Sequence, residues 1–188
     1  ATLARWHNSL LQDQFEIDDA IRAKTAELVA GLQTPAEKLE AVYRFVAKQV
    51  RYLDHDVGIF GKKPNQAVNV FANRFGDCKD KATLMIAMLR YLGLQAHYAA
   101  VRTRDAGPLF WQVPYAQSNH IITYLRAQPG LPAARFVDAT ASFSHVDYLP
   151  ERDQGVKALV LTGEGHLLVD TPELGPAASA RRVTLTPA

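Results

Sequence analysis

The amino-acid sequence predicts an α+β fold in which helices come first and a largely antiparallel sheet follows. Up to about Leu92, apolar residues recur three and four positions apart, which is the spacing of helices that bury one face. From Gln95 onward, apolar residues fall into short runs bounded by turn residues, which is typical of strands. Helices followed by strands, instead of a regular alternation of the two, favour an antiparallel sheet over a parallel one.

Helical spacing covers five segments before the period changes. The third segment has the clearest start signal, because Thr34 is an N-cap residue, Pro35 takes the first helical position and Glu37 is an acidic third residue. A break that contains two glycines and a proline predicts a loop over residues 52–65. The expected helices, one of them only a helical turn, span residues 3–14, 17–32, 35–51, 67–74 and 78–92.

The second half of the chain predicts short strands joined by loops. A long irregular segment, residues 104–118, follows the first strand and contains Phe110, Trp111 and Tyr115. Its aromatic side chains either line a substrate groove or cover the core, and long loops in compact domains are often functional. The expected strands span residues 95–103, 120–126, 134–138, 157–162, 166–170 and 181–186.

The composition is that of an ordinary globular protein. Hydrophobic residues make up 48% and charged residues 21% of the chain, and the net charge is +2. Basic residues are interleaved with acidic ones, so we expect no nucleic-acid partner. No apolar stretch approaches the roughly 18 residues of a membrane span, so we expect no membrane-spanning segment.

One cysteine and six histidines limit the metal and disulfide chemistry of the chain. A single cysteine excludes an internal disulfide and a cysteine-rich zinc site. No two histidines stand at a convincing metal-ligand spacing, so we expect neither a metal nor another cofactor.

The 188 residues are expected to form one domain. The sequence begins at Ala1 without a methionine, and a helical pattern is under way by Leu3, so we expect a piece of a longer protein with flanking domains. The cellular location is left open. A leader on the full-length chain would direct the domain to the periplasm or out of the cell.

The stretch from Gly76 to Ala82, Gly-Asp-Cys-Lys-Asp-Lys-Ala, places the cysteine at the start of a helix. Asp77 is a good N-cap residue and Asp80 follows three positions later, so Cys78 becomes the first helical residue. The free N–H groups and the positive end of the helix dipole favour a thiolate there, and the two lysines of the stretch would add to this if they pointed at the sulfur. Taken alone, a cysteine at the edge of a core is more often a small buried hydrophobic residue.

A nucleophilic cysteine needs a base and a group that orients the base. His120 is the best candidate for the base because it opens a strand after the irregular loop. Asp138 closes the next strand, and the start of one strand lies near the end of the next if the two pair antiparallel. The Asp138 carboxylate would then hold the imidazole in the right tautomer. Taken singly, His120 is more often a core histidine and Asp138 a turn residue.

An oxyanion hole needs two hydrogen-bond donors aimed at the developing charge. The backbone N–H of Cys78 is a natural first donor. Gln66, Asn69 and Asn73 lie upstream in the sequence and are equal candidates for the second.

Three segments together resemble the bacterial transglutaminase-like domain. They are Gly76-Asp77-Cys78-Lys79-Asp80-Lys81-Ala82-Thr83-Leu84, Asn119-His120-Ile121-Ile122 and Phe136-Val137-Asp138-Ala139-Thr140. The order cysteine, histidine, aspartate matches that superfamily. The resemblance covers about residues 35–142 and implies a core there, with a helical N-terminal extension over residues 1–34 and C-terminal strands over residues 143–188. It also implies a papain-like arrangement, in which the helix that carries the cysteine packs on the antiparallel sheet that supplies the other two residues.

The resemblance implies Cys78 as the nucleophile, His120 as the base and Asp138 as the orienting residue. The implied reaction is amide-bond chemistry on a peptide or protein substrate through a thioester. Water as the second nucleophile gives peptidase or amidase activity, which we favour because water is in excess, and a lysine amine gives transglutaminase-type acyl transfer. Lys79 stands where animal transglutaminases have an aromatic residue, so crosslinking is not implied. The alternative is a catalytically inactive scaffold that binds a peptide or protein in the same groove.

Overall fold

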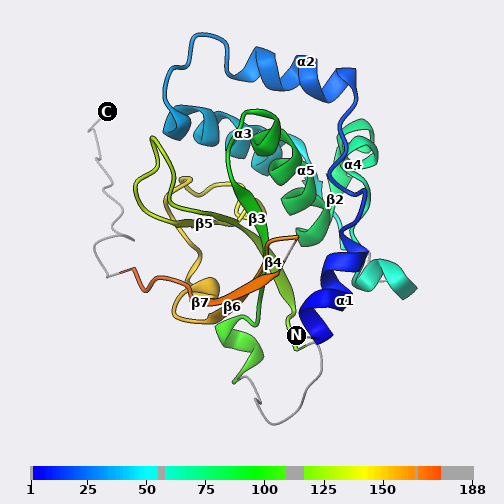
Figure 1. Cartoon of the computed structure of the whole chain (residues 1–188), viewed down its shortest axis with the longest axis vertical. Coiled ribbons are helices and arrows are strands. Elements are labelled where there is room, and N and C mark those ends of the chain that lie inside the picture. Colours follow the sequence, from blue (N-terminus) through cyan, green and yellow to red (C-terminus); the bar gives the residue numbers. More distant parts are fainter. Residues whose placement is uncertain (1, 55–57, 109–116, 164, 175–188) are drawn as a thin grey trace, which may run out of the picture.

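A computed structural model describes residues 2–54, 58–108, 117–163 and 165–174. Helices occupy the first half of the chain and a sheet the second (Figure 1). The helices are α1 (Thr2–Leu10), α2 (Asp19–Leu28), α3 (Pro35–Gln49), α4 (Ala67–Asn73) and α5 (Cys78–Tyr91). The strands are β1 (Arg51–Tyr52), β2 (Phe75–Gly76), β3 (Ala96–Val101), β4 (His120–Leu125), β5 (Arg135–Val137), β6 (Lys157–Leu161) and β7 (His166–Asp170). Short 3₁₀ helices are η1 (Gly58–Gly61), η2 (Arg104–Ala106) and η3 (Glu151–Asp153).

Strands β3 to β7 form one antiparallel sheet in the order β5-β4-β3-β6-β7. The central strand β3 pairs with β4 from Ala96↔Leu125 to Val101↔His120, and with β6 on its other side. This arrangement confirms the predicted α+β fold with a largely antiparallel sheet. Strands β6 and β7 therefore continue the same sheet that carries His120.

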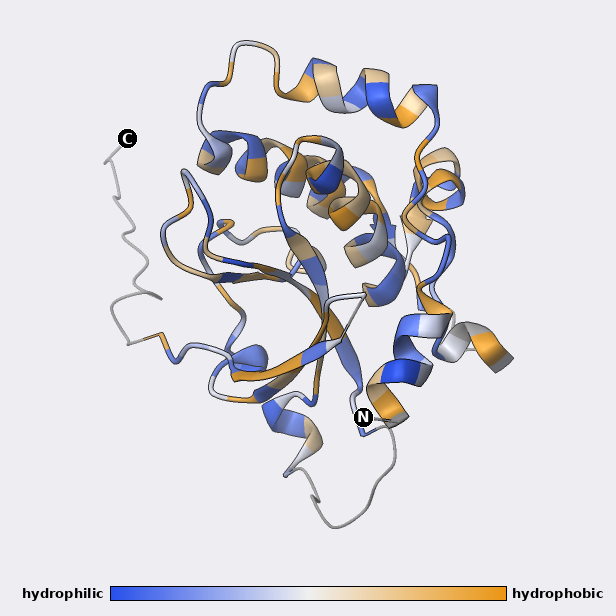
Figure 2. Ribbon diagram, viewed as in Figure 1, coloured by the Kyte–Doolittle hydropathy of each residue, from blue (hydrophilic) through white to orange (hydrophobic). Residues whose placement is uncertain are grey.

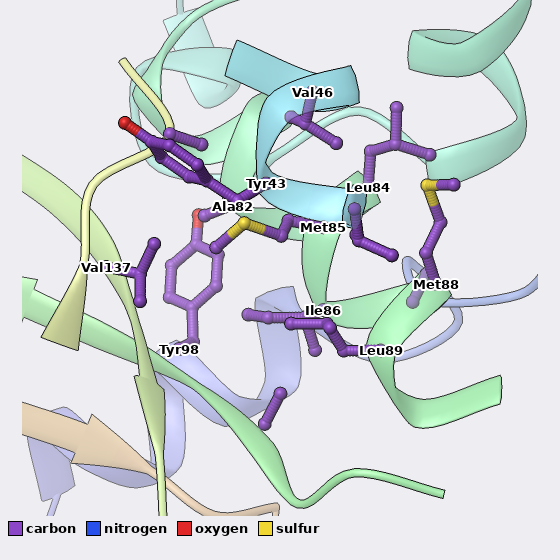
Figure 3. Close-up of a cluster of buried hydrophobic side chains, with 14 of the residues drawn as sticks. Tyr43, Val46, Ala82, Leu84, Met85, Ile86, Met88, Leu89, Tyr98 and Val137 are labelled. Carbon is purple, nitrogen blue, oxygen red and sulfur yellow. The ribbon is translucent and has the colours of Figure 1, made fainter. Parts of the chain in front are cut away.

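Helix α5 lies between the sheet and the other helices. It contacts α2, α3 and α4 on one side and β3 and β4 on the other. Burial of an apolar side chain stabilises a fold by about 1.5–3 kcal/mol, so this packing holds α5 and its first residue firmly in place. Figure 3 shows the packed side chains, with Tyr43 and Val46 from α3 and Tyr98 and Val137 from the sheet around Ala82, Leu84, Met85, Ile86, Met88 and Leu89 of α5.

Helix α2 lies at the surface, and bands of hydrophilic and hydrophobic residues alternate along its ribbon (Figure 2). It buries Ile21 and Thr25 against the rest of the fold. At the other end of the molecule, the edge strand β7 is hydrophobic in colour although Leu168 is half exposed. Among the described residues, no helix has the length and apolar character that crossing a membrane requires.

The structure shortens some predicted elements and adds two strands, β1 and β2, and three short 3₁₀ helices that were not predicted. The first helix ends at Leu10, and the chain then turns through Asp13, which has a φ of 63°. Strands β1 and β2 pair in parallel over two residues each, Arg51↔Phe75 and Tyr52↔Gly76. So short a pairing has no periodicity of its own, and only the folded chain brings the two segments together.

Two sequence-based expectations fall on residues that the structure does not describe. They are the strand over residues 181–186 and the aromatic side chains of Phe110, Trp111 and Tyr115.

Candidate active site

Cys78 is the first residue of α5, where the structure confirms the predicted start signal. The Asp77 side chain accepts hydrogen bonds from the N–H groups of Lys79 (2.8 Å) and Asp80 (3.3 Å), and Asp80 accepts one from the N–H of Asp77 (3.3 Å). Asp80 also accepts from the N–H of Asn65 at 2.7 Å, which ties the preceding loop to the helix start. The thiol is buried at the edge of the core.

A glycine is required immediately before this helix start. A Cβ atom at Gly76 would come within 2.4 Å of the Cβ atom of Asp80, which real structures essentially never allow. The missing side chain lets the chain pass close enough to Asp80 for the capping bonds to form. Gly76 therefore fixes the approach to Cys78 through packing, since it is not among the glycines with positive φ.

His120 is the first residue of β4 and is buried beside the helix start. Its neighbour Asn119 is held by Thr103, whose N–H donates to Asn119 Oδ1 at 2.9 Å and whose Oγ1 accepts from Nδ2 at 2.8 Å. The imidazole and the side chain of Cys78 line the same cavity. Packing of α5 on β4 thus brings together two residues from opposite halves of the fold.

Asp138 directly follows β5 and is completely buried. Its Oδ2 atom lies 3.2 Å from Nε2 of His120. Thr140 donates from its backbone N–H and its hydroxyl to Oδ1, both at 2.8 Å, so the carboxylate is fixed from two sides. Farther along, the hydroxyl of Tyr43 on α3 donates to the carbonyl of Ala141 at 2.8 Å, which secures the segment after Asp138.

The three residues that the sequence singled out therefore lie together, and their charges reinforce one another. Burial lowers the pKa of His120, but hydrogen bonds to Asp138 and Cys78 and the negative charges there outweigh it and raise the pKa to about 10. Burial raises the pKa of Asp138, but the hydrogen bond to His120 and its positive charge hold that pKa well below its ordinary value. The pair is an imidazolium held by a carboxylate at neutral pH.

Two residues of η3 complete this environment, and sequence reasoning missed both. Nη2 of Arg152 lies 3.2 Å from Asp138 Oδ2, 3.0 Å from Thr140 Oγ1 and 3.5 Å from His120 Nε2. Asp153 is completely buried, with Oδ2 at 3.9 Å from His120 Nε2. In the sequence they form a charged run after a proline, which is typical of an exposed loop and carries no signal of a site.

Tyr52, at the end of β1, was also missed. Together with Cys78 and His120 it lines a cavity of about 230 Å³. Burial raises the pKa of its phenol to about 12, and negative charge on Cys78 acts in the same direction, so the hydroxyl keeps its proton and remains a donor. By contrast, two of the three residues considered as candidates for the second oxyanion donor, Asn69 and Asn73, are exposed on α4.

A second hollow of about 400 Å³ adjoins the first, because Tyr52, Asn119 and His120 line both. Arg152 faces this second hollow together with Thr103, Asp105 and Thr140. The site is thus open on both sides of the imidazole, towards Cys78 and towards Arg152.

The side chains of Lys79 and Lys81 bind groups that hold α5 in place. Lys79 pairs with Asp77 through its ammonium group. Lys81 is fully buried and donates to the carbonyls of Ala47 (3.2 Å) and Val50 (2.7 Å) at the end of α3. Burial lowers the pKa of Lys81 to about 8. Lys81 therefore joins α5 to α3.

The side chains of His120, Asp138 and Asp153 stand close enough to hold a metal ion, since one ligand atom from each lies within 4.8 Å of the others. The guanidinium of Arg152 approaches the same Asp138 and His120 atoms, however. A cation already occupies this position, and a metal ion would have to displace it.

Comparison with known proteins finds one matching family and two structures with the same fold. A model of the transglutaminase-like superfamily matches residues 22–129, which is more than half of the chain and includes Cys78 and His120. No curated protein matches the chain.

Two crystal structures share the fold. One, provisionally described as a protease from Parabacteroides distasonis, has a TM-score of 0.64 and 13% identity over 91% of this chain and 32% of its own. The other, provisionally described as a cysteine protease from Cytophaga hutchinsonii, has a TM-score of 0.52 and 18% identity over 70% of this chain and 40% of its own. At such identities the likeness shows the fold. This chain spans less than half the length of either protein.

Proposed function

The chain belongs to the transglutaminase-like superfamily, and we propose that it is a cysteine enzyme that cleaves amide bonds through Cys78, His120 and Asp138. The observation that carries the proposal is the position of one imidazole. His120 lines the same cavity as Cys78 at the start of α5, and its Nε2 atom lies 3.2 Å from a buried carboxylate oxygen of Asp138. A nucleophile, a proton carrier and an orienting group in this order are the requirements of covalent amide chemistry.

In the first step, His120 holds the proton of the Cys78 thiol, and the resulting thiolate sulfur attacks the carbonyl carbon of the substrate. A C–S bond forms, and the carbonyl electrons move onto oxygen. As the tetrahedral species collapses, the C–N bond breaks and the His120 imidazolium gives its proton to the leaving nitrogen. A thioester on Cys78 and a free amine result.

The negative charge on the carbonyl oxygen needs two donors. The backbone N–H of Cys78 points out of the first turn of α5, where the helix leaves it without a partner of its own. The protonated hydroxyl of Tyr52 lines the same cavity and is our candidate for the second donor.

In the second step, His120 has lost its proton and acts as a base. It takes a proton from water, whose oxygen attacks the thioester carbon, and the C–S bond breaks to release a carboxylic acid. An amine in place of water would give acyl transfer. We favour hydrolysis because two adjoining hollows give solvent access to both sides of the imidazole.

We propose a peptide or protein as the substrate. The cavity at Cys78 is small, about 230 Å³, and many of its lining residues are polar, so it suits a segment of backbone better than a large apolar group. The residues that line it are His7, Tyr52, Asp54, Gly61, Lys62, Asp77, Cys78, Lys79, Ser118, Asn119, His120 and Ile121.

Alkylation with iodoacetamide at pH 6 tests the proposal on the full chain. We expect Cys78 to react readily at this pH, and His120→Ala to slow the reaction by about 10²-fold, because a free thiol carries little thiolate below about pH 8.5. His145→Ala is the matched control, since the side chain of His145 is well exposed and lines neither hollow of the site. A Cys78 that is inert at pH 6 and insensitive to His120→Ala would leave the inactive scaffold as the better description.

Ammonia release then separates the two second steps. The enzyme is given a glutamine peptide with and without an added amine, and the products are identified by mass. Glutamate as the product in both cases indicates hydrolysis, and an amine adduct indicates acyl transfer.

A further inference from the structure

A second carboxyl group is buried behind His120. Asp153 ends η3, where its N–H donates to the carbonyl of Pro150 at 2.9 Å. The hydroxyl of Thr171 donates to the carbonyl of Asp153 at 2.6 Å. These backbone bonds fix the residue, and its side chain, which is 0% exposed, faces the imidazole.

The side chain of Asp153 has no donor of its own. Neither carboxylate oxygen accepts a hydrogen bond from any residue that the structure describes. The two nearest cations are close but outside hydrogen-bonding distance, with Arg152 Nε at 3.7 Å from Oδ1 and His120 Nε2 at 3.9 Å from Oδ2. An ionised carboxylate in this position would lose its hydration without replacing it, whereas a protonated one needs only an acceptor.

Asp138 provides that acceptor. One oxygen atom of Asp138 lies within 4.8 Å of one of Asp153, and Asp138 is the member that stays ionised because His120 and Thr140 donate to it. Burial raises the pKa of Asp153 to about 7. The charges on His120 and Arg152 oppose the rise, and the charge on Asp138 supports it.

The charged groups around Asp153 come from every neighbouring element. His120 faces it from β4, Asp138 from the segment after β5 and Arg152 from η3 itself. The negative charge of Asp105 on η2 acts on Arg152. Two buried acids whose surroundings push their proton affinities apart are a recurrent feature of catalytic sites.

From this arrangement we propose that Asp153 is a positioning residue, a buried carboxylic acid that donates a hydrogen bond to Asp138 and sets the charge behind His120. The proposal rests on the proposed function, in which His120 gives its proton to the leaving amine. While Asp153 is protonated, the carboxyl pair carries one negative charge, and its hydrogen bond fixes the carboxylate that faces Nε2. When the Asp153 proton leaves to solvent, the pair carries two.

The second charge changes the acid strength of His120. Two carboxylates hold the imidazolium proton more tightly than one, so His120 becomes a weaker acid towards the leaving nitrogen. Ionisation of Asp153 therefore sets an upper limit to the pH range of the first chemical step. A purely structural Asp153 would anchor η3 without affecting how His120 titrates.

Nuclear magnetic resonance of the full chain, with ¹⁵N-labelled histidine, tests the proposal without a substrate. In the wild type, the His120 signal should titrate in two stages, with a smaller inflection near pH 7 that reports Asp153. Asp153→Asn should remove that inflection and weaken proton binding to His120 at least about tenfold, or about one pH unit. Asp147→Asn, which removes an exposed acid, should leave both stages in place.

Three outcomes would overturn the proposal: an inflection that persists in Asp153→Asn, an unchanged midpoint for His120 in that variant, or no inflection in the folded wild type. The third outcome is measured on the wild type alone, so it still tests the proposal if Asp153→Asn does not fold. The inflection should also persist in Cys78→Ala, because Asp153 is its source. This experiment measures a chemical shift and not turnover, so it is independent of the proposed function. An inert Cys78 would contradict the proposed function without affecting the coupling between Asp153 and His120. An active Cys78 without the inflection would contradict the coupling alone.

Discussion

Nε2 of His120 lies 3.2 Å from Oδ2 of Asp138, although the two residues are 18 positions apart in the chain. The pairing of β4 with β5 makes this contact, because His120 opens β4 and Asp138 follows the last paired residue of β5. Arg152, from the segment that leads into β6, reaches the same oxygen at 3.2 Å. The buried carboxylate of Asp138 therefore connects β4 with η3.

Asp138→Asn should leave His120 without the charge that holds its proton. We expect kcat/KM for amide cleavage to fall by about 10²- to 10⁴-fold, since an amide neither stabilises the imidazolium nor fixes its tautomer. Steady-state kinetics check this, with Asp147→Asn as the control for loss of an exposed acid. Undiminished activity would remove Asp138 from the mechanism.

The ion pair should also make stability depend on pH. The folded-state pKa of His120, about 10, is above the value of about 6.5 expected for the unfolded chain. Its contribution is therefore complete below about pH 6.5 and is lost as the pH rises through about 10. We expect urea unfolding to show a loss of up to about 5 kcal/mol between these limits, and a much smaller loss in Asp138→Asn. A flat profile in the wild type would contradict the pairing.

Tyr52→Phe removes the proposed second oxyanion donor and keeps the ring. We expect kcat to fall by about 10²- to 10³-fold with the fold intact, because one donor to a developing oxyanion has this effect in other enzymes. Tyr91→Phe is the matched control, since Tyr91 is 47% exposed, like Tyr52, and lies at the far end of α5. Equal kinetics for the two variants would assign the second donor to another group.

Gly76→Ala should disturb the start of α5. The added Cβ atom would meet the Cβ atom of Asp80 at 2.4 Å, so the capping carboxylate must move. We expect a loss of about 1–3 kcal/mol in the free energy of unfolding, together with slower alkylation of Cys78 at pH 6. In the control, Gly165→Ala, the added atom would meet Thr162 Oγ1 at an ordinary 3.7 Å. Similar effects of the two substitutions would show that the close approach does not matter.

Asp153→Asn should make the protein more stable at neutral pH. The folded-state pKa of Asp153, about 7, is above the value of about 3.9 for a free carboxyl, so the contribution of this group is complete below about pH 4 and is lost as the pH rises through about 7. An amide has no such loss. Relative to the wild type, we expect the variant to gain stability between pH 4 and 7, on the order of 4 kcal/mol, measured by urea unfolding at each pH. A gap that does not change with pH would show that Asp153 titrates normally.

Local signals in the sequence were sufficient wherever a few consecutive residues carry the whole structure. The start of α5 at Cys78 was predicted because Asp77 and Asp80 satisfy each other's backbone groups within one turn. The positions of His120 and Asp138 at the start and end of strands were also predicted, since alternation and the turn residues mark those ends. Their antiparallel pairing was an expectation, which the register of β4 and β5 confirms.

The residues that were missed have no local signature. Tyr52 reaches the cavity because β1 pairs with β2, a contact of only two residues on each strand. Arg152 and Asp153 reach His120 because the chain crosses over from Asp138 to β6, where the hydroxyl of Thr171 holds the end of η3. In the sequence these charged residues have the appearance of an exposed turn.

By itself, then, the sequence determined the order of helices and strands, the position of Cys78 at the start of a helix and the candidates His120 and Asp138. It could do so because capping and periodicity act over a few neighbouring residues. Only the tertiary structure decided which charges surround the imidazole and which residues line the cavity with Cys78. Those contacts join residues that are distant in the chain, and they depend on strand register and helix packing. Burial then raises or lowers the pKa of each group by an amount that no linear pattern records.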